Sequence, residues 1–182
     1  GDWSSDVCSS DLPDMDMEHP ANDPQGMRTA SVATRAQGYA LGCTQFERSE
    51  GIAYAAGSVY FCCTNGGPKA FGQVFRLDLR RQQLSLVVEP DESAVLDGPD
   101  NLCVAHSGDL VVCEDNLGKR ENFVVGVTPS GKCYRIARNA HPSRREFAGA
   151  CFSADGRTLF VNVQEPGMTF AIRGPWRNRH DD

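Results

Sequence analysis

The chain has 182 residues, of which 40% are hydrophobic and 23% are charged, a composition typical of a globular protein. Its net charge of −6 argues against a nucleic-acid partner, because phosphate backbones attract basic proteins. No apolar run approaches the roughly 20 residues that are needed to cross a bilayer, so we expect no membrane span.

The N-terminal part of the chain lacks the pattern of a folded core. Residues 1–12, GDWSSDVCSSDL, resemble the translation of a sequencing-library adapter, and we predict that they are an artefact; a disordered natural N-terminus is the alternative. Residues 13–40 are rich in Pro, Asp, Met and Gly and are expected to be a loop or a disordered segment. The adapter interpretation implies a fragment of a longer protein, in which case a missing signal peptide has no bearing on the compartment.

From residue 41 onwards the sequence repeats itself with a period of about fifty residues. The three copies are SEGIAYAAGSVYFCCTNGG (49–67), PDNLCVAHSGDLVVCEDNLG (99–118) and FAGACFSADGRTLFVNVQEPG (147–167). Each copy has a short apolar strand, a glycine-bearing turn, a second apolar strand and a polar cluster that ends in Gly. Ile52, Leu102 and Ala150 occupy equivalent positions, and the turn glycines, which suit a positive φ, are Gly57, Gly108 and Gly156.

Further strands are predicted between the copies. Residues 72–79 and 82–90 alternate apolar and polar side chains, and residues 122–139 form a predicted hairpin around a PSGK turn. Each unit therefore has about four strands, and four strands in roughly 40 to 50 residues are typical of a β-propeller blade. The predicted fold is all-β, a partial β-propeller of about three four-stranded blades; a β-sandwich or a β-solenoid is the alternative.

The third unit stops one strand short, after TFAIRGPW at 169–176, and a strand from elsewhere in the chain could complete it. Propellers have about four to eight blades, so three cannot close a ring. We therefore expect further blades N-terminal to this chain, and an apolar flank that is exposed without them. Residues 177–182 are expected to form a tail.

Acidic residues recur at the ends of the predicted strands. Glu50 and Asp100 lie just before the first strand of their units, and Glu114 and Asp115 follow a second strand. If these two strands form an inner hairpin, both positions lie at one end of it, and carboxylates from different blades converge. Like charges repel each other at close range, so we expect a cation between them. Oxygen ligands favour calcium, magnesium, manganese or ferric iron.

Simpler roles are open for the same residues. Asp97 and Asp100 flank Gly98 and Pro99 and could make side-chain turns. Glu50 could form a simple ion pair with its neighbour Arg48. Exposed surface positions are the alternative for Glu114 and Asp115, and a surface ion pair with Arg144 or Arg145 is the alternative for Glu146. The histidines at 106 and 141, in AHSG and AHPS, are expected to be turn residues.

The cysteines do not form a recognisable metal or disulfide pattern. Setting aside Cys8 in the adapter-like segment, the number that remains is odd, and no CxxC motif repeats. Four of them lie in apolar runs and are expected to be small core residues; these are Cys62, Cys63, Cys113 and Cys151.

Five motifs in order resemble the C-terminal half of the PhoX-type alkaline phosphatases. They are FERSEG (46–51), LDGPDNL (96–102), VVCEDN (111–116), EFAGACFSADGRTLFVNVQ (146–164) and PGMTFAIRGPW (166–176). The resemblance departs at Ser49, where the family usually has Pro, and it assigns 41–176 to the C-terminal half of a propeller phosphatase domain. It implies a six-bladed propeller with a multi-metal site of ferric iron and calcium in the central channel.

The resemblance also implies an activity and a location. The expected reaction is hydrolysis of a small-molecule phosphomonoester, by a protein exported through the twin-arginine route to the periplasm or the outside. The full-length protein is expected to be a monomer, and this fragment alone is expected to be inactive. The family's iron-binding Cys lies in the N-terminal half, so no Cys of this chain is given that role.

Carried over residue by residue, the resemblance makes Arg48 a clamp for phosphate oxygens, since a planar guanidinium suits such contacts. The implied metal ligands are Glu50, Asp100, Asn101, Glu114, Asp115 and Glu146. Two other functions stay open at this point. One is a lactonase-like propeller hydrolase with a single calcium, and the other is a non-enzymatic propeller that binds partners.

Overall fold

The computed structural model describes residues 38–176, and the chain divides into two compact units, 1–45 and 46–182. The described part of the first unit holds one short helical turn at 38–40. The described part of the second unit holds eleven β-strands and no helix, so the prediction of an all-β fold is confirmed. No helix among the described residues is long and apolar enough to span a bilayer.

Three predictions concern residues that the structure does not describe. The artefact at 1–12, most of the loop at 13–40 and the tail at 177–182 all lie outside the described residues, and these remain predictions.

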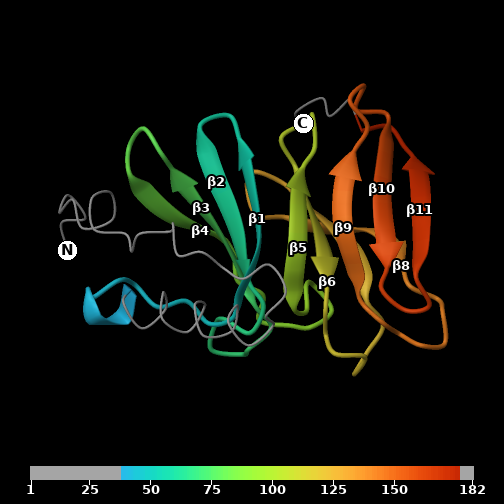
Figure 1. Ribbon diagram of the computed structural model, residues 1–182, viewed down its shortest axis with the longest axis horizontal. Coiled ribbons are helices and arrows are strands. Elements are labelled where there is room, and N and C mark those ends of the chain that lie inside the picture. The colour runs from blue at the N-terminus through green and yellow to red at the C-terminus, as the bar shows by residue number, and fades with distance from the viewer. Residues whose placement is uncertain (1–37, 177–182) are drawn as a thin grey trace, which may run out of the picture. The chain divides into compact units, whose positions relative to one another are not determined.

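The strands form three antiparallel sheets that follow one another along the chain, and in each sheet every strand pairs with the next one (Figure 1). The first sheet holds β1 (Ser49–Ala55), β2 (Ser58–Cys63), β3 (Gln73–Asp78) and β4 (Gln83–Val88). The middle sheet holds β5 (Pro99–Val104), β6 (Leu110–Glu114), β7 (Phe123–Val127) and β8 (Cys133–Arg138). The third sheet holds β9 (Phe147–Phe152), β10 (Thr158–Val163) and β11 (Met168–Arg173).

The first strand of each sheet lies innermost. β5 packs against both β1 and β9, although each of the three strands belongs to a different sheet. The three strands also run in the same direction (Figure 1), so their starting residues lie at one end of the molecule's second unit. This is the arrangement of successive β-propeller blades, and the predicted partial propeller is confirmed.

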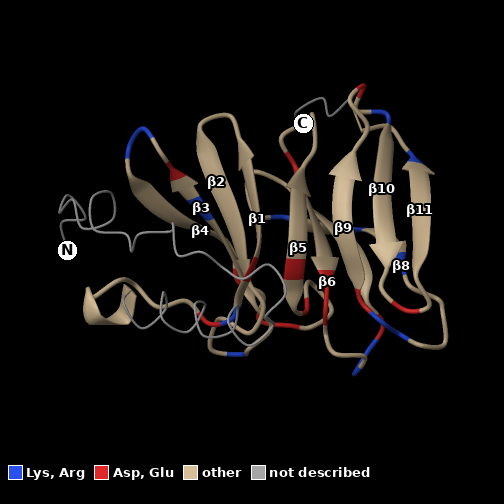
Figure 2. Ribbon diagram, in the orientation of Figure 1, with Lys and Arg blue, Asp and Glu red and all other residues tan. Residues whose placement is uncertain are grey.

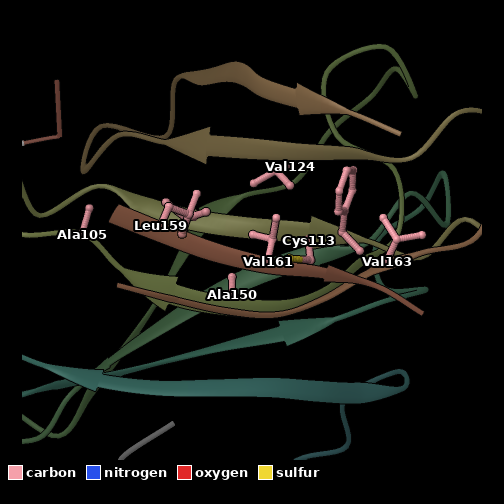
Figure 3. Close-up of a cluster of buried hydrophobic side chains, with 9 residues drawn as sticks. Ala105, Cys113, Val124, Ala150, Leu159, Val161 and Val163 are labelled. Atoms are coloured by element: carbon pink, nitrogen blue, oxygen red, sulfur yellow. The ribbon is translucent and has the colours of Figure 1, made fainter. Parts of the chain in front are cut away.

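β6 shows why the middle sheet is buried on both faces. Successive side chains of a strand point to opposite faces. Val111 and Cys113 therefore join a cluster shared with the third sheet (Figure 3), whereas Leu110 and Val112 join a cluster shared with the first sheet. All five residues of β6 are buried, the acid Glu114 included.

The hairpins between first and second strands turn where the sequence predicts. Gly57, Gly108 and Gly156 have φ values of 77°, 86° and 66°. These values lie in the left-handed region, which only glycine adopts without steric cost, so the three turns depend on these residues.

The outer two sheets are less covered than the middle one. Ile52 and Tyr54 on β1 are 69% and 68% exposed, and Phe170 on β11 is 42% exposed. The third sheet has three strands, so the outer edge of β11 has no strand partner within residues 38–176. These features agree with the expected apolar flank and with a third unit that is one strand short.

The predicted burial of the cysteines holds for three of the four. Cys62, Cys63 and Cys113 are buried, whereas Cys151 is exposed. Cys151 follows the buried Ala150 on β9, and strand alternation turns its side chain away from the cluster that Ala150 joins. The prediction for Cys151 is therefore wrong, and the cysteines of the described region are free thiols.

Candidate metal and phosphate site

Three carboxylates converge at the end of the second unit where the inner strands begin. Asp100 lies at the start of β5, Asp115 directly follows β6, and Glu146 directly precedes β9. One oxygen atom from each of them lies within 4.8 Å of the others. Figure 2 shows acidic residues at this lower end of β5, β6 and β9. Two neighbouring sheets thus contribute to one group of oxygen donors.

A β-bulge in each inner strand lies at this end. The β5–β6 pairing is irregular between Pro99 and Asn101, which makes Asp100 the unpaired residue. β1 has an irregularity between Ser49 and Ile52, and β9 has one opposite Phe160 and Asn162. Bulges bend a strand and redirect a side chain, so the bulge in β5 turns the Asp100 carboxylate toward the group.

The carboxylates line a hollow of about 380 Å³ together with residues from all three sheets. Its other lining residues are Arg48, Glu50, Leu117, Gly118, Arg145 and Gln164. The lining is therefore mostly polar, with two arginines and four acidic residues.

Arg48 is held by two of these carboxylates. Its Nη2 atom donates to Oδ2 of Asp115 at 2.9 Å, and its Nε atom lies 3.5 Å from Oε1 of Glu50. The hydrogen bond to Asp115 is the main reason that the pKa of Arg48 is raised, in spite of partial burial. Arg48 itself has a φ of 49°, an uncommon conformation for a residue with a side chain. Backbone strain of this kind occurs often at functional sites.

Glu146 and Asp100 resist ionisation in this environment. Burial raises the pKa of Glu146 to about 7, and the nearby charges of Asp115 and Asp100 add to the shift. Burial also raises the pKa of Asp100, helped by the charges of Glu50 and Asp115. A cation between these groups would reverse the repulsion and favour their ionised forms.

The Thr64 hydroxyl is a buried polar group near the carboxylates. Thr64 is fully buried, and its Oγ1 atom makes no hydrogen bond of ordinary geometry with any described residue. It nevertheless lies near enough to Asp100 for a hydrogen-bonding interaction that opposes the rise in the pKa of that carboxyl. Buried polar atoms are usually satisfied. A buried hydroxyl beside converging carboxylates fits a site for a hard cation and its bound water.

The sequence profile of the family described as "Alkaline phosphatase PhoX" matches residues 10–167. The chain belongs to the PhoX alkaline phosphatase family. No curated protein sequence matches the chain. Among solved structures, one provisionally described as a gluconolactonase is similar at 15% sequence identity and a TM-score of 0.45. The match covers 69% of this chain and 59% of that structure, so the PhoX chain spans less than two thirds of the length of that structure.

The structure brings together five of the seven residues that the PhoX resemblance nominates. Three of them, Asp100, Asp115 and Glu146, form the carboxylate group. The other two, Arg48 and Glu50, line the same hollow.

The remaining two residues, Glu114 and Asn101, do not line the hollow. Oε1 and Oε2 of Glu114 accept hydrogen bonds from the backbone N–H groups of Asp97 and Phe123, at 2.9 Å and 2.8 Å. Oδ1 of Asn101 accepts a hydrogen bond from the N–H of Ala150 at 3.0 Å, which links β5 to β9. Both residues adjoin a member of the carboxylate group, and these hydrogen bonds engage their side chains with backbone N–H groups outside it. In this structure both side chains hold the backbone, and their assignment as metal ligands stays a prediction.

Sequence reasoning considered Arg145 only as a surface ion-pair partner of Glu146, and the structure places it in the lining of the hollow. The available signal was its position directly before Glu146, at the start of an inner strand. The two histidines lie as predicted. His106 lies in the turn between β5 and β6, and His141 lies in the loop that precedes β9.

Proposed function

We propose that this chain supplies part of the active site of a metal-dependent phosphomonoester hydrolase. The observation that supports the proposal is the convergence of Asp100, Asp115 and Glu146 beside the guanidinium of Arg48. Clustered carboxylate oxygens suit a hard cation, and a guanidinium suits phosphate oxygens. Membership in the PhoX family favours calcium and ferric iron as the cations.

Each residue would act through the geometry described above. The three carboxylates would hold the metal, which supplies charge neutralisation and activates water for attack on phosphorus. Arg48 is held by Asp115 and Glu50, which fixes its guanidinium plane at the wall of the hollow. From there its N–H groups would bind phosphoryl oxygens and stabilise the charge that they carry in the transition state.

We further propose that the complete protein is a six-bladed propeller, of which this chain is the C-terminal half. The missing blades would cover the exposed apolar flank of β1 and complete the ring of metal ligands, and this chain alone would be inactive. Export by the twin-arginine route, a periplasmic or extracellular location and a monomeric state belong to the same proposal.

Metal analysis and hydrolysis of p-nitrophenyl phosphate by the complete polypeptide test the proposal. We expect bound calcium and iron, and a loss of kcat/KM of about 100-fold or more for Arg48→Ala, the size expected for removing a transition-state hydrogen-bond donor. Calcium alone with an unaffected Arg48→Ala variant would instead favour a lactonase-like hydrolase. The absence of any bound metal would contradict the proposal, and so would hydrolysis by the 182-residue chain alone.

A further inference from the structure

We infer that Arg145 is a second anion-binding residue of this site, which binds the phosphoryl group of the substrate from the side opposite to Arg48. The inference rests on the proposed phosphatase function. It assigns a binding role to a residue for which that function specifies none.

The topology places the two arginines on either side of the carboxylates. Arg48 directly precedes β1, and Arg145 lies two residues before β9. β5, which carries Asp100, packs between β1 and β9. Both arginines line the same hollow. A phosphoryl group held above Asp100 would therefore meet a guanidinium from the first sheet and another from the third.

The backbone of Arg145 is fixed by buried polar side chains. Its carbonyl accepts a hydrogen bond from Nδ2 of Asn139 at 2.7 Å, and the carbonyl of Arg144 accepts one from Nδ2 of Asn122 at 3.0 Å. Both asparagines are buried. The Oδ1 atom of Asn122 also accepts a hydrogen bond from the backbone N–H of Asn116, the residue that follows Asp115. The loop that carries Arg145 and the loop that carries Asp115 are thus held by one asparagine.

The side chain of Arg145 keeps donors available. Its Nε atom donates to Oε2 of Glu165 at 2.9 Å, and Glu165 is not part of the lining of the hollow. No partner is described for its two terminal nitrogens within residues 38–176. By contrast, Arg48 has both its Nε and its Nη2 atoms directed at carboxylates of the hollow. Arg145 is therefore the arginine of this hollow with the larger number of unengaged N–H groups.

These donors suit a tetrahedral oxyanion. Two terminal amino groups in one plane match two oxygens of a phosphate, and Glu165 orients this plane through the Nε atom. A neutral substrate such as a lactone would gain little from a second guanidinium. The alternative is that Arg145 and Glu165 form only a surface ion pair, which contributes little to stability or binding.

The experiment uses the complete polypeptide that contains this chain, loaded with calcium and iron, and inorganic phosphate as the probe. Calorimetry gives the dissociation constant of phosphate, and p-nitrophenyl phosphate hydrolysis gives KM and kcat separately. We expect Arg145→Ala to weaken phosphate binding and to raise KM by about 10-fold or more, as for the loss of charge-assisted hydrogen bonds. Arg145→Lys, which keeps the charge without the planar pair of donors, should recover only part of the affinity.

Arg138→Ala is the matched control. Arg138 pairs with Glu121 at 2.8 Å, is about as exposed as Arg145, and lies outside the hollow. We expect its phosphate affinity to stay within about twofold of the unaltered protein. Thermal unfolding of each variant separates a loss of folding from a loss of binding.

The outcomes separate the inference from the function on which it rests. If the unaltered protein binds phosphate and a folded Arg145→Ala variant binds it equally well, the inference is overturned and the phosphatase proposal stands. If the metal-loaded protein neither binds phosphate nor hydrolyses the ester, both are overturned.

Discussion

The middle and first sheets share one sequence repeat but differ in what covers them. Leu102 in β5 and Ile52 in β1 occupy equivalent positions, yet Leu102 is 4% exposed and Ile52 is 69% exposed. The middle sheet has a neighbour on each face, whereas the first sheet has a described neighbour on one face. The sequence of a blade therefore specifies which side chains are available to pack against a neighbouring blade. Whether those side chains are buried depends on the presence of that neighbour.

The two sheets also differ in the polar residues that they contribute to the candidate site. The middle sheet carries Asp100 and Asp115, two of the three converging carboxylates, and its buried Glu114 supports the backbone behind them. The first sheet contributes Arg48 and Glu50 to the edge of the hollow. The sheet that is covered on both faces thus holds the centre of the candidate site, where low solvent access strengthens electrostatic interactions.

Truncation of the two equivalent apolar residues should show the largest difference. We expect Leu102→Ala to lower the free energy of unfolding by about 3 kcal/mol, because it leaves a cavity in a packed cluster. Ile52→Ala should change it by less than about 0.5 kcal/mol in this chain, because Ile52 is exposed. Urea unfolding of the two variants measures both values, and equal losses would contradict the comparison.

In the complete polypeptide, the same two variants test whether a further blade covers β1. If another blade covers β1, Ile52→Ala should cost about 1 to 3 kcal/mol there, in contrast to its small effect in this chain. An unchanged small effect would show that no blade packs on this face.

The pH dependence of stability should reveal the buried acid of the middle sheet. Burial raises the pKa of Glu114 from 4.5 to about 7 in the folded state. The folded protein therefore binds the proton more tightly than the unfolded one, and the free energy of unfolding should fall by up to about 3 kcal/mol as pH rises from about 4.5 to 7. Glu114→Gln should reduce this slope.

Glu89 offers the control for this titration. It follows β4 in the first sheet and is exposed, so Glu89→Gln makes the same chemical change at a surface position. If Glu114→Gln and Glu89→Gln give the same pH profile as the unaltered chain, the buried charge of Glu114 does not affect stability in the way described.

Calcium binding should show a smaller difference between the sheets. Asp115 belongs to the carboxylate group, and we expect Asp115→Asn to weaken calcium binding by about 20-fold in the complete polypeptide. Glu50→Gln, at the edge of the hollow, should weaken it by less than about fivefold. Calorimetric titration measures both, and a stronger effect for Glu50→Gln would move the centre of the site toward the first sheet.

Much of the fold could be predicted because its signals are local. The apolar runs, their spacing and the glycines at 57, 108 and 156 specify the hairpins, and the repeat specifies that the hairpins stack as blades. The exposure of Cys151 was missed because an apolar run does not say which of its alternating residues faces a neighbour. That depends on register, which β9 changes at its bulge.

The candidate site could be predicted only in part for the same reason. Sequence position places Glu114 and Asp115 equally close to the end of a strand, but Asp115 lines the hollow whereas Glu114 accepts hydrogen bonds from backbone N–H groups. The bulge that makes Asp100 face the hollow, and the asparagine contacts that hold Arg145, arise from pairing between distant segments. Neither has a signature in the local sequence.

A crystal structure of the complete polypeptide with anomalous scattering data tests the central claim most directly. The account predicts a metal ion within coordination distance, about 2.0 to 2.6 Å, of carboxylate oxygens of Asp100, Asp115 and Glu146. A metal ion ligated by Glu114 and Asn101 instead, or three carboxylates that point to solvent with no ion between them, would contradict it.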